Sequence, residues 1–255
     1  MFEQLQNYAD LTPAEFATVG VVVFLAAIVR GFSGFALSAL VMASLAVMIP
    51  PVELIALCWF LEMAASVLMV RGGAGEADKK VVLGLVSGSI VGTPIGLTLT
   101  TTVPISTSKM IALAVICVLA ILLLCKVRWD FLATRPGLYL SGLTAGIMTG
   151  LASVGGLVVT LYVLSQDMPA RVIRASLVIF LFVSSSASFF YLIFYGMMTS
   201  TIVARAVFTV PLVFAGVFVG KMIFRPSMER HYKRFCLMLL IALAGFGLLQ
   251  TVTSG

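Results

Sequence analysis

The sequence predicts an all-α membrane protein that crosses the bilayer many times. Its composition is 61% hydrophobic, and the stretches 175–204 and 235–255 contain no charged residue. An apolar run of about 20 residues matches the hydrocarbon core of a bilayer, which is about 30 Å thick. Lipid offers no hydrogen bonds to the backbone, so runs of this length must be helical. With 255 residues, the chain has room for one membrane domain and no separate soluble domain.

Apolar runs and helix-breaking residues divide the chain into ten segments. The sixth and seventh segments, 137–152 and 154–166, together hold about 30 residues, fewer than the roughly 40 that two full crossings need. We therefore expect a broken or re-entrant hairpin there, with its break at Ser153–Gly156, and a similar break at Gly31–Gly34 in the first pair. The segments are 14–31, 34–49, 52–70, 81–101, 108–125, 137–152, 154–166, 171–195, 201–222 and 234–252.

The positive charges predict the topology. Thirteen of the sixteen Lys and Arg residues lie in four regions, at 71–80, 126–135, 171–174 and 221–234. The positive-inside rule places these four regions in the cytoplasm and both termini outside. A net charge of +6 is then explained by cytoplasmic loops that face anionic lipid headgroups, and nucleic acid is not an expected partner.

The two halves of the chain resemble each other. Gly92 and Gly96, followed by Lys109, match Gly216 and Gly220, followed by Lys233, at a constant offset of 124 residues. The loop after Gly96 is uncharged and the loop after Gly220 is strongly basic, so equivalent loops lie on opposite sides. This predicts an inverted repeat of 14–125 and 137–252 joined by a linker at 126–136, a plan typical of secondary transporters.

The two breaks are candidate anion-binding sites. A helix that starts inside the membrane leaves amide groups unpaired and has the positive end of its dipole beside them, which attracts anions. The alternative is that the glycines only allow close helix packing. The candidate substrate-binding residues are Ser33, Gly34, Ser38, Ser153, Gly155 and Gly156.

Glu62 is the carboxylate that lies deepest in an apolar segment, which makes it a functional candidate. Burial disfavours its charged form, so it is either a proton carrier or a protonated acid bonded to a neighbouring helix. For Arg30 we favour a position in which the side chain extends to the cytoplasmic surface. The alternative places Arg30 inside the bundle, where it meets an anion or Glu62.

Three further groups have two interpretations each. Arg174, with Arg171, forms either a cytoplasmic entry funnel for anions or a topology signal. Ser184 and Ser188 share a helix face and either line a polar path or bond to a neighbouring helix. Glycines at every fourth position from 84 to 96 form a packing surface, either within the chain or in a homodimer.

The sequence contains little that would support catalysis. The four cysteines have no paired spacing and the single histidine lies in a basic loop, so we expect no disulfide, metal site or cofactor. Gly31-Phe32-Ser33-Gly34 has the Gly-x-Ser-Gly form of a membrane serine hydrolase, but that chemistry needs a base within hydrogen-bond reach, and neither the histidine nor a lysine lies well inside a span. We therefore expect no catalytic residues, and an anion channel with the same pore is the closer alternative to a carrier.

The residues around the two breaks resemble the sulfite exporter family called TauE/SafE. The similarity is carried by Arg30–Phe35 in the first half and Gly146–Gly156 in the second. The first half has Leu37-Ser38-Ala39 where the family commonly has three glycines. The resemblance implies a bacterial inner-membrane transporter that exports a small sulfur-containing anion, of the sulfite or organosulfonate class.

Overall fold

The computed structural model describes residues 10–70, 74–166, 169–223 and 229–253. Each of the ten predicted segments corresponds to one helix of this part of the chain. The α-helices are α2 (Pro13–Ser33), α3 (Leu37–Leu45), α4 (Pro51–Val70), α5 (Lys79–Thr102), α6 (Ile105–Leu124), α7 (Arg135–Ala152), α8 (Gly155–Leu164), α9 (Ala170–Phe194), α10 (Ser200–Ile223) and α11 (Glu229–Thr253), with short 3₁₀ turns η1 (Ala74–Glu76) and η2 (Asp130–Ala133).

Local sequence signals explain where several of these helices begin. Thr12 caps α2 and pairs with Glu15 in a reciprocal capping box, in which the Thr12 amide donates to Glu15 Oε2 over 2.9 Å. The side chain of Asp78 accepts bonds from the first amides of α5, and that of Thr134 does so for α7. Pro51 is the first residue of α4, a position where the missing amide hydrogen costs nothing.

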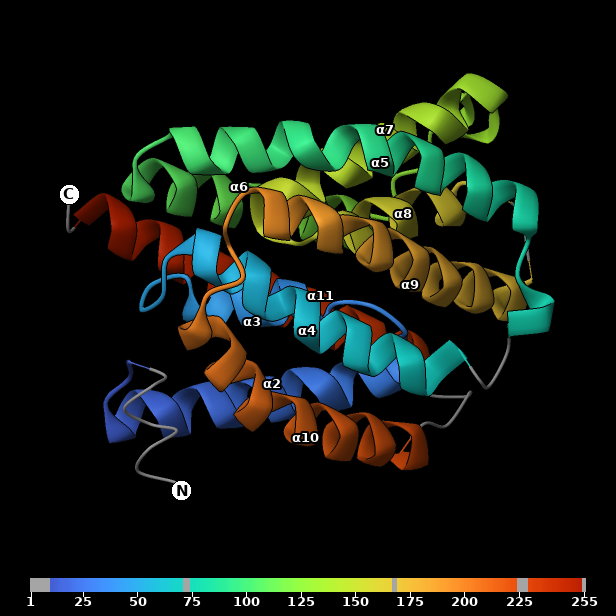
Figure 1. The fold of residues 1–255 in the computed structure, drawn as a ribbon. Coiled ribbons are helices and arrows are strands. Elements are labelled where there is room, and N and C mark those ends of the chain that lie inside the picture. The colour runs from blue at the N-terminus through green and yellow to red at the C-terminus, as the bar shows by residue number, and fades with distance from the viewer. Residues whose placement is uncertain (1–9, 71–73, 167–168, 224–228, 254–255) are drawn as a thin grey trace.

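The long helices run between two ends of the molecule (Figure 1). The short helices α3 and α8 bring the chain back, so α2 and α4 run in the same direction, and so do α7 and α9. The start of α2 and the end of α11 lie at the same end, together with the connection from α5 to α6. The starts of α5, α7, α9 and α11 lie at the opposite end, on the right of the view. These starts fall in the basic regions identified from the sequence, so the basic regions gather at one end. That this end faces the cytoplasm stays a prediction.

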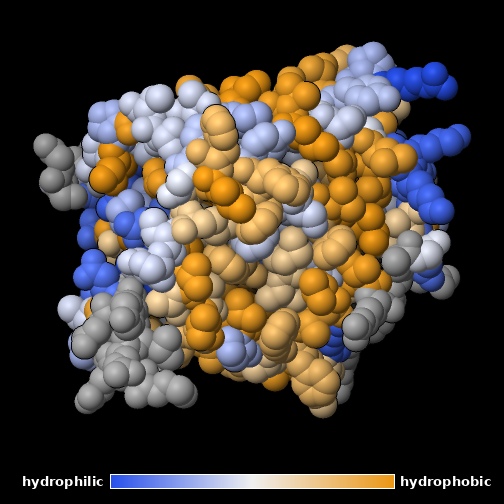
Figure 2. All heavy atoms as spheres, in the orientation of Figure 1, coloured by the Kyte–Doolittle hydropathy of each residue, from blue (hydrophilic) through white to orange (hydrophobic). Residues whose placement is uncertain are grey.

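Seven helices are long and apolar enough to cross a membrane, counted over the described residues. They lie in α2, α4, α5, α6, α9, α10 and α11. On the face shown in Figure 2, hydrophobic side chains cover the middle of the molecule, and the most hydrophilic residues lie toward the two ends. This distribution is what a bilayer requires of a helical protein that spans it.

Two helix pairs are interrupted inside this bundle. Between α2 and α3, Gly34 and Ala36 adopt left-handed conformations with φ of 81° and 76°. Between α7 and α8, Ser153 does the same with φ of 57°. With 9 residues in α3 and 10 in α8, these helices are about 14 and 15 Å long. Each is about half the thickness of a hydrocarbon core, so neither can cross it alone.

The second break lies where the sequence predicted it, and the first lies later than predicted. The prediction placed the first break at Gly31–Gly34, but α2 continues through Ser33. The amide of Gly34 donates to the Arg30 carbonyl over 2.9 Å and closes the last turn. The turn is made at Gly34, where glycine tolerates the left-handed conformation.

The glycine stripe of α5 packs within the chain. A Cβ atom at Gly92 would collide with the Leu143 carbonyl, and one at Gly96 with the Ile147 carbonyl, both on α7. Close approach of two backbones is the usual reason for such stripes in membranes. Because α7 covers this face of α5, the intramolecular alternative is the right one, and the stripe offers no surface for a homodimer.

Candidate functional site

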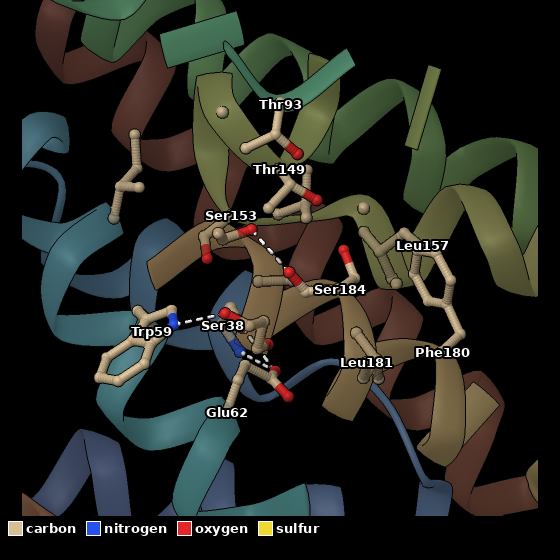
Figure 3. A pocket seen from close by; sticks show the side chains of 18 of the residues that line it. Ser38, Trp59, Glu62, Thr93, Thr149, Ser153, Leu157, Phe180, Leu181 and Ser184 are labelled. Atoms are coloured by element: carbon tan, nitrogen blue, oxygen red, sulfur yellow. Dashed lines mark hydrogen bonds between the residues drawn. The ribbon is translucent and has the colours of Figure 1, made fainter. Parts of the chain in front are cut away.

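A small cavity lies between the two interrupted helix pairs. Its volume is about 50 Å³. Figure 3 shows Thr93, Thr149 and Ser153 on one side of this cavity and Ser38 and Glu62 on the other. The remaining lining residues come from the helices α3, α4, α5, α7, α8 and α9 and from the two breaks: Phe35, Ala36, Ala39, Ile55, Trp59, Leu97, Gly150, Val154, Gly155, Gly156, Leu157, Phe180, Leu181, Ser184, Ser185, Ser188 and Leu192.

The second break directs the start of α8 at the cavity. A Cβ atom at Gly155 would collide with Thr149 Oγ1 and the Ala145 carbonyl, so only glycine allows α8 to begin this close to α7. No side chain caps α8, and the amides of Gly155 and Gly156 have no acceptor within the helix. Two amide donors and the positive end of a short helix therefore face the cavity.

The first break presents a different surface, because a carboxylate already occupies the start of α3. Glu62 Oε1 accepts hydrogen bonds from the Ser38 hydroxyl over 2.5 Å and from the Ser38 amide over 3.3 Å. Glu62 is 8% exposed. Negative charge at a helix start is favourable, and Glu62 supplies this charge at the start of α3. No side chain does so at the start of α8.

Arg30 lies inside the bundle, which corrects the prediction that it extends to the cytoplasmic surface. The residue is 0% exposed, and its Nη2 lies 3.1 Å from Glu62 Oε2 and 3.3 Å from the Ser66 hydroxyl. Nη1 donates to the carbonyl of Gly34 in the first break. Since α2 does not end at Gly31, the guanidinium remains level with the break, and Glu62 supplies the countercharge. The less favoured alternative, in which Arg30 meets Glu62, is the one observed.

Most hydroxyl groups around the cavity already donate hydrogen bonds within the protein. Thr93 and Thr149 each donate to the carbonyl four residues earlier over 2.8 Å, and Ser188 donates to the Ser184 carbonyl over 2.8 Å. The hydroxyl of Ser184 pairs with that of Ser89 over 2.9 Å. The amides at the start of α8 are therefore the donors most readily available to a ligand.

Trp59 forms part of the cavity wall and joins α4 to α9. Its indole Nε1 donates to the Ser185 carbonyl over 2.7 Å, and its ring stacks on Phe189 with centroids 5.0 Å apart. A buried indole usually finds such a polar partner. These contacts hold the central helices of the two halves together beside the cavity.

The candidate residues from the sequence fall into two sets. Ser33 and Gly34 belong to the first break but do not line the cavity, and the Ser33 hydroxyl donates to the Phe35 carbonyl over 2.7 Å. Arg30 lies behind Glu62, and the side chain of Arg174 is outside the described part. The candidates that line the cavity are Ser38, Glu62, Ser153, Gly155, Gly156, Ser184 and Ser188.

Sequence reasoning missed Trp59, Thr93 and Thr149 as cavity residues. Trp59 precedes Glu62 by three residues and so shares its helix face, which was a usable signal. Thr93 lies inside the glycine-rich part of α5, where packing alone was assigned. Thr149 belongs to the glycine-rich stretch before the second break, where only the glycines and the serine were considered.

Apolar helices around a small cavity that carries hydroxyl groups and one carboxylate, with two interrupted helix pairs beside it, are typical of a membrane protein of the transporter class. The model of the sulfite exporter TauE/SafE family matches residues 19–246, and the chain belongs to this family. Its members are transporters and not enzymes, so the serine hydrolase alternative is wrong, and a small anion is the expected kind of substrate. No curated protein and no solved structure matches the chain.

Proposed function

We propose that this protein is a secondary transporter that exports a small sulfur-containing anion by alternating access around the cavity between the two breaks. The observation that carries the proposal is the start of α8, which no side chain caps and where Gly155 and Gly156 line a cavity together with serine and threonine residues. Helix starts of this kind bind anions in proteins generally. The Ser153 hydroxyl lies at the same point and is a further donor.

The size of the cavity favours a sulfite-sized anion over a longer organosulfonate. A volume of about 50 Å³ corresponds to about four water-sized groups, at about 10–15 Å³ for each. Sulfite has one sulfur and three oxygen atoms, whereas an aminoethane sulfonate has three additional non-hydrogen atoms. The side chains of Leu157, Phe180 and Leu181 form an apolar wall on one side of the cavity (Figure 3).

Helix packing supports an inverted repeat, an architecture that is common among transporters that work by alternating access. A Cβ atom at Gly31 would meet the Val217 carbonyl, and one at Gly150 would meet the Thr93 carbonyl. Gly31 and Gly150 each lie three residues before the left-handed residue that follows their helix. Val217 and Thr93 are 124 residues apart (217 − 93), the same offset that relates the glycines of α5 and α10.

Exchange of labelled sulfite across proteoliposomes tests the proposal. A carrier shows exchange that saturates with sulfite and is accelerated by unlabelled sulfite on the opposite side. An anion channel shows flux without such acceleration, and a protein with no sulfite flux above empty liposomes contradicts the proposal. Sulfate, methanesulfonate and chloride in parallel assays define selectivity.

Gly156→Ala tests the site itself. The added methyl group would lie 3.4 Å from Leu181, an ordinary van der Waals contact, and would fill about one of the four water-sized positions. We expect normal insertion with transport reduced at least about tenfold, a loss of about 1.4 kcal/mol of stabilisation. Gly245→Ala in α11 is the matched control, because a Cβ there meets nothing within 4 Å. Equal transport by both variants would remove the start of α8 from the site.

A further inference from the structure

The cavity has an unexpected charge for an anion-binding site. Among its lining residues in the described part of the chain, the one charged side chain is Glu62, and no Lys or Arg is present. A second anion in this cavity would lie close to the carboxylate. Like charges that share a site strongly disfavour each other's ionised form. While Glu62 is charged, the cavity therefore disfavours an anion.

The two helix starts beside the cavity differ in one respect: a carboxylate lies at the start of α3, and the start of α8 faces the cavity. At the first break, Glu62 Oε1 accepts from the amide and hydroxyl of Ser38 at the start of α3. At the second break, the start of α8 has no capping side chain and faces the cavity. Glu62 thus acts as a tethered anion in one half, and the substrate would be the free anion in the other.

Arg30 makes the charge balance of the site depend on Glu62. Its Nη2 lies 3.1 Å from Glu62 Oε2, and both side chains are buried. Glu62 Oε2 forms no geometrically ideal hydrogen bond in the described structure, so the contact is mainly electrostatic. A proton added to Oε2 would remove the negative charge that Arg30 now faces. The positive charge behind Glu62 would then favour a second negative charge in the cavity.

We infer that the substrate anion and one proton bind together, the proton on the Glu62 carboxylate and the anion at the start of α8, so that the anion replaces the negative charge that Glu62 carries in front of Arg30. This inference rests on the proposed function and specifies its coupling. For an anion with one negative charge, such as hydrogen sulfite or methanesulfonate, the net charge of Arg30, Glu62 and ligand is zero before and after binding, which avoids an unpaired charge inside the membrane. By linkage, the proton and the anion then raise each other's affinity by the same factor.

Few other groups near Glu62 can titrate. On α4 itself, the Cys58 thiol lies one turn away and contacts the Ser38 carbonyl over 3.9 Å. On α2 the facing charge is Arg30. Helices α3 and α9 present serine hydroxyls to the cavity, and α5 and α7 present threonine hydroxyls. Charged groups of α10 meet α4 near its two ends, where Arg205 pairs with Glu53 and Lys221 donates to the Leu68 carbonyl. Glu62 is therefore the group through which pH would act.

Binding of methanesulfonate to the purified full-length protein tests this, because the charge of this probe does not change near neutral pH. Between about pH 5.5 and 8.5 we expect the dissociation constant to rise with pH, by up to about tenfold per unit. Calorimetry in two buffers of different ionisation enthalpy should show uptake of about one proton per anion. Binding without proton uptake and with constant affinity would overturn the inference and leave the proposed function standing.

Two variants locate the proton. Glu62→Gln should bind methanesulfonate with no pH dependence and no proton uptake, because its amide carries no charge at any pH in this range. Glu53→Gln is the control, since Glu53 pairs with Arg205 outside the cavity, and it should keep the wild-type dependence. A wild-type slope in Glu62→Gln would assign the proton to another group and overturn the inference. If Glu62→Gln does not fold, proton uptake by the wild type decides the outcome. Failure of the wild type to bind or transport any tested anion would instead contradict the proposed function.

Discussion

Removing either member of the Arg30–Glu62 pair should destabilise the protein strongly. In Arg30→Met, a buried carboxylate loses its cation, and the bonds from Arg30 to the Gly34 carbonyl and the Ser66 hydroxyl are also lost. Leaving one charge of a buried pair uncompensated costs about 3–5 kcal/mol. At about 2–4 °C per kcal/mol for a chain of this size, the melting temperature should fall by about 6–20 °C.

Thermal unfolding of the purified protein in detergent measures this effect, and a double-mutant cycle isolates the pair. Glu62→Gln alone should cost a similar amount, because Arg30 is 0% exposed and would lack a countercharge. The double variant Arg30→Met/Glu62→Gln should recover most of the loss, since no buried charge remains. Additive losses, or single losses below about 1 kcal/mol, would refute the view that the two charges compensate each other. Glu53→Gln should cost less, because the Glu53 side chain is 40% exposed.

Two further predictions concern helix packing and orientation. Gly92→Ala should destabilise the protein more than Gly84→Ala in the same thermal assay. The new methyl group meets the Leu143 backbone in Gly92→Ala, whereas in Gly84→Ala it meets the flexible end of the Leu138 side chain. Equal losses of stability would contradict the backbone contact. Cys125 is exposed beside the basic region that we place in the cytoplasm. A membrane-impermeant maleimide should therefore label it in right-side-out vesicles only after permeabilisation, with Cys125→Ser as the control, and labelling of intact vesicles would reverse the topology.

The helices were predictable because each segment in lipid must satisfy its backbone hydrogen bonds within itself, so its structure depends on its own residues. The number of segments, their approximate ends and the second break all follow from runs of apolar residues and from Ser153–Gly156. The first break was predicted about three residues early. Local sequence does not decide which of two nearby glycines turns the chain. Contact with α10 at Val217 explains the small residue at Gly31, and the turn itself needs Gly34.

Part of the candidate site was also accessible from sequence. Glu62 was identified because a carboxylate deep in an apolar segment is costly, and Gly155 and Gly156 because they follow a break. Trp59 and Thr93 were not identified, since an aromatic or threonine residue in an apolar helix has no distinct signal until its neighbours are known.

By itself, the sequence determined a bundle of membrane-crossing helices, the two interruptions and the gathering of positive charge in four regions, because each depends on the composition of a short stretch. Only the tertiary structure decided that Arg30 turns inward to Glu62, that α7 covers the glycines of α5, and that one helix start is capped by a carboxylate while the other faces a cavity. These features join residues that are 24 positions apart (62 − 38) or more. Their energies depend on distances in space, and the hydropathy of short stretches of the chain gives no information about those distances.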